Sequence, residues 1–204
     1  MDDYEQSKSP AHLRMIFEDF FWVTFAIGFK RGQREKELKA APMRIDRNVK
    51  NHIASVMPFK LTNAQRKVTA QIFEDMQSRA PMNRLLQGDV GSGKTIVALV
   101  AMLAAMENNL QTAMMAPTEI LAEQHARTIK RLLARTPYRV EMLTGSLRAA
   151  EKRHLQNALK EGEIHACIGT QALIQEAVAF EKLGLVVIDE QHRFGVMQLS
   201  LIHI

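Results

Sequence analysis

The chain has 204 residues, of which 47% are hydrophobic and 24% are charged, so it can bury a core as an ordinary globular domain does. Lysine and arginine number 27 against 22 aspartates and glutamates, and this net charge of +5 suits a nucleic-acid partner without requiring one. The single cysteine, Cys167, excludes an intrachain disulfide and a cysteine-based zinc site.

Residues 1–57 are expected to form a helical N-terminal segment and linker. Its main feature is a stretch at 13–38 that predicts one or two helices, apolar early and charged late. The charged end is either a solvated helix face or a contact with DNA phosphates. The apolar run 20–27 is too short to cross a membrane, because a crossing helix needs about 20 apolar residues. Since the acidic start is unlike a signal peptide, we expect a cytoplasmic protein. A further helix is expected near 48–56, ending before Pro58.

From residue 58 to 198 the pattern changes to alternating helices and strands. The predicted helices cover residues 63–77, 96–106, 119–133 and 147–160. The predicted strands cover residues 84–87, 112–116, 138–143, 165–168 and 185–188. Cys167 is interpreted as a small buried hydrophobe on one of these strands. Alternation with apolar strands predicts an α/β fold whose parallel sheet is covered by helices on both faces.

The most informative segment fits the pattern G-x-x-x-x-G-K-[ST], which wraps a nucleotide triphosphate. Its residues are Gly88, Asp89, Val90, Gly91, Ser92, Gly93, Lys94 and Thr95. The glycines let backbone N–H groups turn toward phosphates, and the helix that follows adds its positive dipole end. Lys94 is expected to reach the β- and γ-phosphates of ATP, and the Thr95 hydroxyl to bind Mg²⁺. The alternative is a glycine turn with a solvated lysine.

Asp189 and Glu190 follow the apolar strand predicted at 185–188. Ligands of doubly wound sheets bind at the carboxyl ends of the strands. Asp189 is expected to help hold Mg²⁺, and Glu190 to orient and activate the attacking water. The alternative, a strand that ends in solvated acids, is common where no phosphate loop accompanies it.

Phe59 and Gln65 precede the phosphate loop and are candidates for adenine recognition. An amide side chain matches N6 and N7 of adenine, and a phenylalanine ring can stack on the base. Gln65 is otherwise an ordinary residue in the first turn of a helix.

Three strand-end turns carry small residues suited to phosphate contact: Pro117 and Thr118, Thr144 and Gly145, and Gly169 and Thr170. Such residues are equally good helix caps.

These segments, in this order and together with Gln191 and His192, resemble superfamily 2 helicases. In detail the runs at 86–95, 115–125 and 189–196 look like the RecG family of ATP-dependent DNA branch-migration helicases. The resemblance implies a RecA-like P-loop NTPase domain that uses ATP and Mg²⁺ to remodel branched DNA in recombination and repair. It also implies that Gln191 and His192 couple nucleotide state to DNA, and that the three turns touch the DNA strand.

Two alternatives remain open. The first is a translocase like the transcription-repair coupling factor, although Gln191 and Ser92 depart from its pattern. The second is a nucleotide-binding module with little turnover. It follows from the expectation that the family's wedge domain and second RecA-like domain, which supplies an arginine finger, are absent from this chain. Residues 199–204 do not resemble the family and are expected to be a foreign tail.

Overall fold

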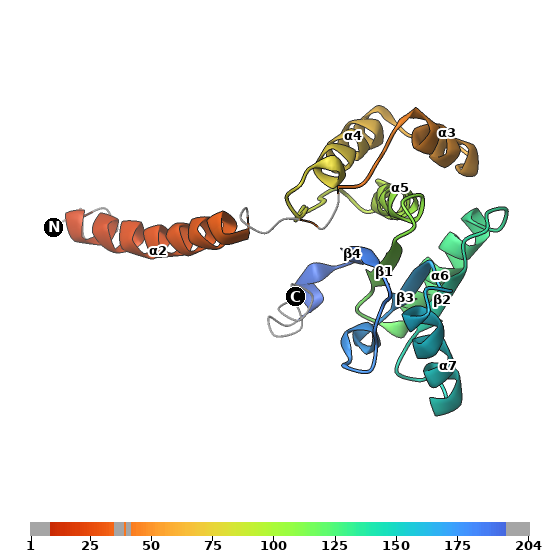
Figure 1. Cartoon of the computed structure of the whole chain (residues 1–204). Helices are drawn as coiled ribbons and strands as arrows, with labels where there is room; N and C mark the ends of the chain where they lie inside the picture. Colours follow the sequence, from red (N-terminus) through yellow and green to blue (C-terminus); the bar gives the residue numbers. More distant parts are fainter. Residues whose placement is uncertain (1–8, 35–38, 40–41, 195–204) are drawn as a thin grey trace. The chain divides into compact units, whose positions relative to one another are not determined.

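The structure, a computed structural model, describes residues 9–34, 39 and 42–194 (Figure 1). The chain divides into two compact units, Met1–Pro42 with Ser78–Asn83, and Met43–Gln77 with Arg84–Ile204. The second unit therefore begins before the boundary expected at residue 57. The proposed tail at 199–204, and the last residues of the expected main domain, lie outside the described residues.

The first unit contains one long helix, α2, which spans Pro10–Arg34. The Ser9 hydroxyl accepts a hydrogen bond from the N–H of His12 at 3.4 Å. A proline suits the first helical position, because its missing N–H would have no partner there. The helix predicted at 13–38 is thus confirmed as a single helix over its described part, while residues 35–38 lie outside that part.

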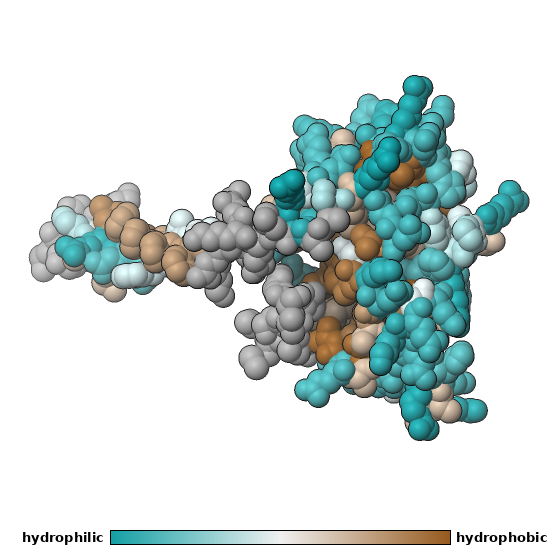
Figure 2. Space-filling model, viewed as in Figure 1, coloured by the Kyte–Doolittle hydropathy of each residue, from teal (hydrophilic) through white to brown (hydrophobic). Residues whose placement is uncertain are grey.

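Four phenylalanines of α2 stack along one side of the helix. Phe17, Phe21, Phe25 and Phe29 follow one another at i, i+4 spacing, and their successive ring centroids lie 5.8, 6.0 and 6.2 Å apart. All four rings are exposed, and Figure 2 shows apolar side chains along this helix in brown. Within the described residues, no helix is both long and apolar enough to cross a membrane.

The second unit is built on a parallel four-stranded sheet. β1 (Gln111–Met115) and β3 (Ala166–Gly169) lie in its middle, between β2 (Val140–Leu143) and β4 (Leu183–Ile188). Every residue of β1 and β3 is buried. Because side chains alternate between the two faces of a strand, both faces of the central strands are covered. The predicted parallel sheet is therefore confirmed, with Cys167 buried on β3.

Helices of the predicted lengths pack on this sheet or, as α3 and α4 do, on α5. They are α3 (Arg47–Val56), α4 (Asn63–Gln77), α5 (Lys94–Met106), α6 (Glu119–Leu132) and α7 (Ala149–Lys160), with the short 3-10 helices η1 (Gln171–Ile174) and η2 (Gln191–Arg193). α5 packs on β1 and β4, α6 packs on β2 and β3, and α7 contacts β2. Residues 99–106 of α5 are all buried, as expected for a helix that is apolar on every side.

The strand predicted at residues 84–87 is wrong. This segment carries no strand pairing, and the side chain of Leu85 is exposed. A strand forms only where a neighbour exchanges backbone hydrogen bonds with it, and the sheet order places no described strand beside these residues. The segment is fixed through a side chain instead, because Arg84 Nε donates to Asp75 Oδ2 at 2.7 Å.

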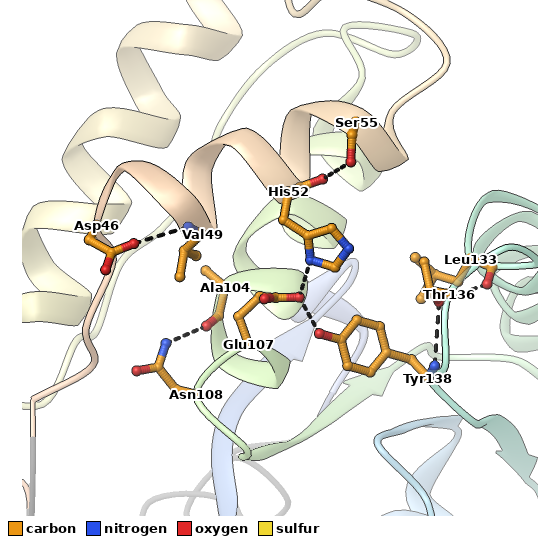
Figure 3. A network of polar contacts seen from close by, with 10 residues as sticks. All are labelled: Asp46, Val49, His52, Ser55, Ala104, Glu107, Asn108, Leu133, Thr136 and Tyr138. Atoms are coloured by element: carbon orange, nitrogen blue, oxygen red, sulfur yellow. Dashed lines mark hydrogen bonds and ion pairs between the residues drawn. The ribbon is translucent and has the colours of Figure 1, made fainter.

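A partly exposed polar network joins α3, the end of α5 and the loop before β2 (Figure 3). The Glu107 carboxylate contacts His52 Nδ1 at 2.6 Å and accepts a hydrogen bond from the Tyr138 hydroxyl. Burial, together with the carboxylate, raises the pKa of Tyr138, so the phenol remains a donor. The network ties α3 to the end of α5 and to the loop before β2, all within the second unit.

Chain direction places the phosphate-loop segment at the carboxyl edge of the sheet. α5 leads into β1 through residues 107–110 and packs against it, so helix and strand run in opposite directions. With 13 residues α5 is about 20 Å long, against about 17 Å for the 5 residues of β1. The start of α5 therefore lies at the edge where all four parallel strands end.

Candidate functional site

The phosphate-loop residues form a tight turn that leads directly into α5. Gly91 and Gly93 have φ angles of +80° and +83°, a left-handed conformation that residues with a side chain rarely adopt. Gly93 is the N-cap of α5 and supplies no capping side chain. The first N–H groups of a helix have no partner within it and carry partial positive charge, so this turn suits an anionic group.

Lys94 folds back over the loop that precedes it. Its Nζ donates hydrogen bonds to the carbonyl oxygens of Gly88 at 2.7 Å and Asp89 at 3.0 Å. The Asp89 carbonyl also accepts from the N–H of Ser92 at 3.2 Å, which closes the turn. Val90, at the tip between them, is fully exposed. The lysine thus holds the loop in shape with its charge at the surface where a phosphate would approach.

Gln65 lies against the same loop. Its Nε2 donates to the carbonyl of Ser92 at 3.0 Å, and its Oε1 accepts from the N–H of Thr62 at 3.0 Å. The Thr62 hydroxyl in turn accepts from the Gln65 N–H at 3.2 Å. An amide has a second N–H and further lone pairs, so Gln65 retains one donor and one acceptor for a base.

Phe59 is close to half exposed and lines a mostly apolar pocket of about 260 Å³ formed with residues of α3, α4 and α5. Lys60 and Arg66 also line this pocket. Phe59 and Gln65 come from one short stretch of chain, and Gln65 is hydrogen-bonded to the phosphate loop through Ser92.

Asp189 comes directly after β4, at the carboxyl edge. Its N–H donates to the Met115 carbonyl at 2.8 Å, which extends the pairing of β4 with β1 by one residue. Its carboxylate Oδ2 lies 2.8 Å from Nε2 of His125 on α6. The sequence interpretation did not assign His125, although it closes the run at 115–125 that carries the resemblance. The spacing of His125 could have identified it: the residue lies two helical turns after Thr118 and one turn after Ala122, which is buried, so it lies on the same side of α6 as these residues.

Glu190 has a φ of +51°, so a residue with a full side chain occupies the left-handed region. Such a conformation costs about 1–2 kcal/mol and is found at sites where the surrounding structure holds it. Gln191 and His192 follow in η2, with the Gln191 side chain exposed. Phe194 is buried in the core beside Leu143 and anchors this segment.

The three predicted contact turns differ in what their side chains do. The Thr118 hydroxyl caps α6 by accepting from the Leu121 N–H at 3.3 Å, and Pro117 is half-buried beside it. Thr144 is only 1% exposed, so its hydroxyl, which pairs with Ser146, is withdrawn from the surface. The adjoining Gly145 is exposed.

At the third turn, Gly169 is buried, and Thr170 is half-buried and precedes η1 without capping it. A Cβ at Gly169 would lie 2.1 Å from the Leu143 carbonyl oxygen, so the glycine is required by the close approach of two backbones.

Glu119 joins two of these turns and was not singled out from the sequence. Its carboxylate accepts from the Ser146 hydroxyl at 2.7 Å and from the Ser146 N–H at 3.1 Å. These hydrogen bonds lower the pKa of Glu119, so the carboxylate stays charged. The turns that begin α6 and follow β2 are therefore fixed to each other.

The oxygen donors at this edge are chemically suited to Mg²⁺. This ion takes oxygen ligands, keeps several waters, and needs only one or two carboxylates beside substrate phosphates. Thr95 offers a hydroxyl and Asp189 a carboxylate, both partly exposed. Among the described residues there is no cluster of three histidine, cysteine, aspartate or glutamate side chains, so no metal site made of protein groups alone is indicated.

Comparison with known proteins gives a consistent picture. Residues 62–203 match the family model described as DEAD/DEAH box helicase. The chain is 46% identical over 191 residues to the ATP-dependent DNA helicase RecG of Aquifex aeolicus, covering 94% of this chain and 24% of that protein. It is 41% identical over 198 residues to RecG of Escherichia coli K12, covering 97% of this chain and 28% of the relative. The chain thus spans about a quarter of the length of the curated relatives it matches.

Solved structures agree with these matches. A structure described as RecG bound to a three-way DNA junction is 45% identical, with a TM-score of 0.81 over 91% of this chain and 26% of that one. A hypothetical ATP-dependent RNA helicase from Sulfolobus tokodaii shares the fold at 17% identity and a TM-score of 0.55, covering 78% of this chain and 45% of that one. The resemblance expected from the sequence runs is therefore confirmed.

Proposed function

Because the chain belongs to the DEAD/DEAH box helicase family, we propose that it is the ATP-binding motor lobe of a RecG-type DNA helicase. The observation that carries this proposal is the left-handed turn at Gly91 and Gly93. It sets the open N–H groups of α5 and the Lys94 charge at the edge where β4 ends and Asp189 follows. This arrangement favours a nucleotide over any other anion, because the loop length and the Lys-Thr pair match a triphosphate with its metal.

In this proposal the phosphates lie in the loop formed by Gly88, Asp89, Val90, Gly91, Ser92, Gly93, Lys94 and Thr95. Lys94 exchanges its two carbonyl partners for phosphate oxygens, a stronger interaction because both groups are charged. Gln65 keeps its bond to Ser92 and turns its remaining donor and acceptor to adenine, while Phe59 stacks on the base.

For hydrolysis, Thr95 and Asp189 would hold Mg²⁺, which would neutralise phosphate charge when bound. Glu190, whose backbone is fixed in an unusual conformation, orients the attacking water and accepts its proton. Gln191 and His192 follow at once in η2 and couple this chemistry to DNA.

We further propose that branched DNA is the substrate of the whole protein, in recombination and repair in the cytoplasm. The support is the similarity to RecG helicases, one of which is described as bound to a three-way DNA junction. DNA would contact the exposed Thr118 and Gly145 and the half-buried Thr170 in the strand-end turns, with Pro117 beside Thr118. Thr144 and Gly169 would shape the turns from within.

Titration calorimetry with Mg·ATP tests the nucleotide site. Lys94→Ala should weaken binding about 10–100-fold, because a hydrogen bond to a charged group contributes about 1.5–3 kcal/mol. Lys160→Ala on α7 removes the same charge at an exposed position and should change nothing. Gln65→Ala should lose the preference for ATP over GTP and retain the phosphate interaction. Equal affinity of the Lys94 variant and the wild type, with both folded by circular dichroism, would refute the phosphate-loop assignment.

A further inference from the structure

His125 reaches from α6 to the end of β4. Its Nε2 lies 2.8 Å from Asp189 Oδ2, and the two side chains are only 12% and 27% exposed. An ionised carboxylate can only accept hydrogen bonds, so Nε2 carries the proton and donates it. The interaction is therefore a largely shielded, charge-assisted hydrogen bond between two elements that are far apart in sequence.

This contact differs from the ion pairs on the helix surfaces. Arg127 and Glu123, also on α6, pair at 3.0 Å with side chains 81% and 59% exposed. Exposed pairs of this kind contribute little to stability. His125 instead contacts Asp189, the one carboxylate assigned to the metal. Replacing His125 should therefore change metal binding at that site.

Asp189 is held from two directions. The Met115 carbonyl fixes its backbone through the bond at 2.8 Å, and His125 fixes the rotation of its carboxylate. Without the imidazole, the carboxylate could turn freely about its side-chain bonds and would lose entropy on binding a cation. With Oδ2 held by His125, Oδ1 has a defined direction for a cation or its water shell.

We propose that His125 is the positioning residue for Asp189, and that the tight binding of Mg²⁺ with the nucleotide depends on this hydrogen bond. The inference rests on the nucleotide-binding function proposed above. Groups that hydrogen-bond to a metal-ligating side chain fix its orientation, and their loss typically costs about 10–100-fold in metal affinity. α6, which begins at the Thr118 turn, thus contributes to the metal site through a residue two turns inside the helix.

Two substitutions separate positioning from general structure. His125→Leu fills the space and removes the donor, whereas His125→Gln places an amide N–H close to the position of Nε2. His154→Ala removes an exposed histidine from α7 and serves as the matched control. Thermal melting followed by circular dichroism checks that each variant folds.

The measurement uses a fluorescent ATP analogue on the 204-residue chain. Its affinity without metal is determined in EDTA, and Mg²⁺ is titrated into a separate sample of the complex that contains no chelator. His125→Leu should raise the half-saturating Mg²⁺ concentration about 10–100-fold and leave the affinity in EDTA unchanged. His125→Gln should recover most of the loss, and His154→Ala should match the wild type.

The results distinguish this inference from the function on which it rests. If the wild type binds with normal Mg²⁺ dependence and His125→Leu does the same, only the inference is overturned. An equal loss in the leucine and glutamine variants, or an equal loss in EDTA, also overturns it, because the donor would not be what matters. A wild-type chain with no affinity for the analogue would overturn the proposed function itself.

Discussion

Replacing Gly93 by alanine tests how the phosphate loop is built. The glycine has a φ of +83°, and a Cβ on it would lie 2.4 Å from Gln65 Nε2. The left-handed conformation costs a residue with a side chain about 1–2 kcal/mol. Displacing the Gln65 amide from the Ser92 carbonyl adds about 0.5–1.5 kcal/mol. Gly93→Ala should therefore lower the free energy of unfolding by about 1.5–3.5 kcal/mol, less about 0.4–1 kcal/mol because alanine restricts the unfolded chain.

Gly91→Ala is the matched control, because Gly91 has a similar φ of +80° but no atom within 4 Å of the added Cβ. Urea denaturation should show that the Gly93 variant is less stable than the Gly91 variant by about 0.5–1.5 kcal/mol. In a Gln65→Ala background, the difference between the two alanine variants should vanish, since the clashing group is gone. Equal destabilisation in the wild-type background, or a difference that persists without Gln65, would refute this account of the loop.

Two further predictions concern the framework. Gln111→Leu should destabilise the fold by about 2–5 kcal/mol in urea denaturation. The reason is that the buried Gln111 amide donates to the carbonyls of Leu159 and Ile164 at 2.9 and 2.8 Å and accepts from the backbone N–H of Lys182. A loss below about 1 kcal/mol would contradict this role. Burial lowers the pKa of His165, whose Nδ1 accepts a hydrogen bond from the backbone N–H of Arg139. The stabilising contribution of the neutral imidazole should therefore be complete above the unfolded pKa of about 6.5, and it should be lost as pH falls through the lower folded pKa. Thermal melting between about pH 5 and 8 should show that His165→Asn, which keeps an acceptor and does not titrate, loses less stability in acid than the wild type; parallel pH profiles would rule this out.

The helices and strands that the sequence predicted correctly have local causes. The predicted helix at 63–77 coincides with α4, because Thr62 and Gln65 cap its first turn through their own side chains. The predicted helix at 119–133 starts where expected, since the Thr118 hydroxyl caps α6. The strand predicted at 84–87 failed because strand formation requires a neighbouring chain, which no local pattern specifies.

The same division applies to the candidate site. The phosphate loop could be identified from the sequence because its chemistry is contained in eight successive residues, Gly88 to Thr95, and its left-handed glycines are a local backbone requirement. The position of Asp189 and Glu190 after an apolar strand was equally local, and β4 ends where predicted.

Only the tertiary structure brought together residues that the chain keeps apart. Gln65 meets Ser92 across 27 residues, and His125 meets Asp189 across 64. Packing also buries Thr144, which the sequence had predicted to contact DNA. The carboxyl ends of parallel strands lie at one edge of the sheet, however far apart the strands are in sequence. Strand order and helix packing therefore decide which residues become neighbours at that edge.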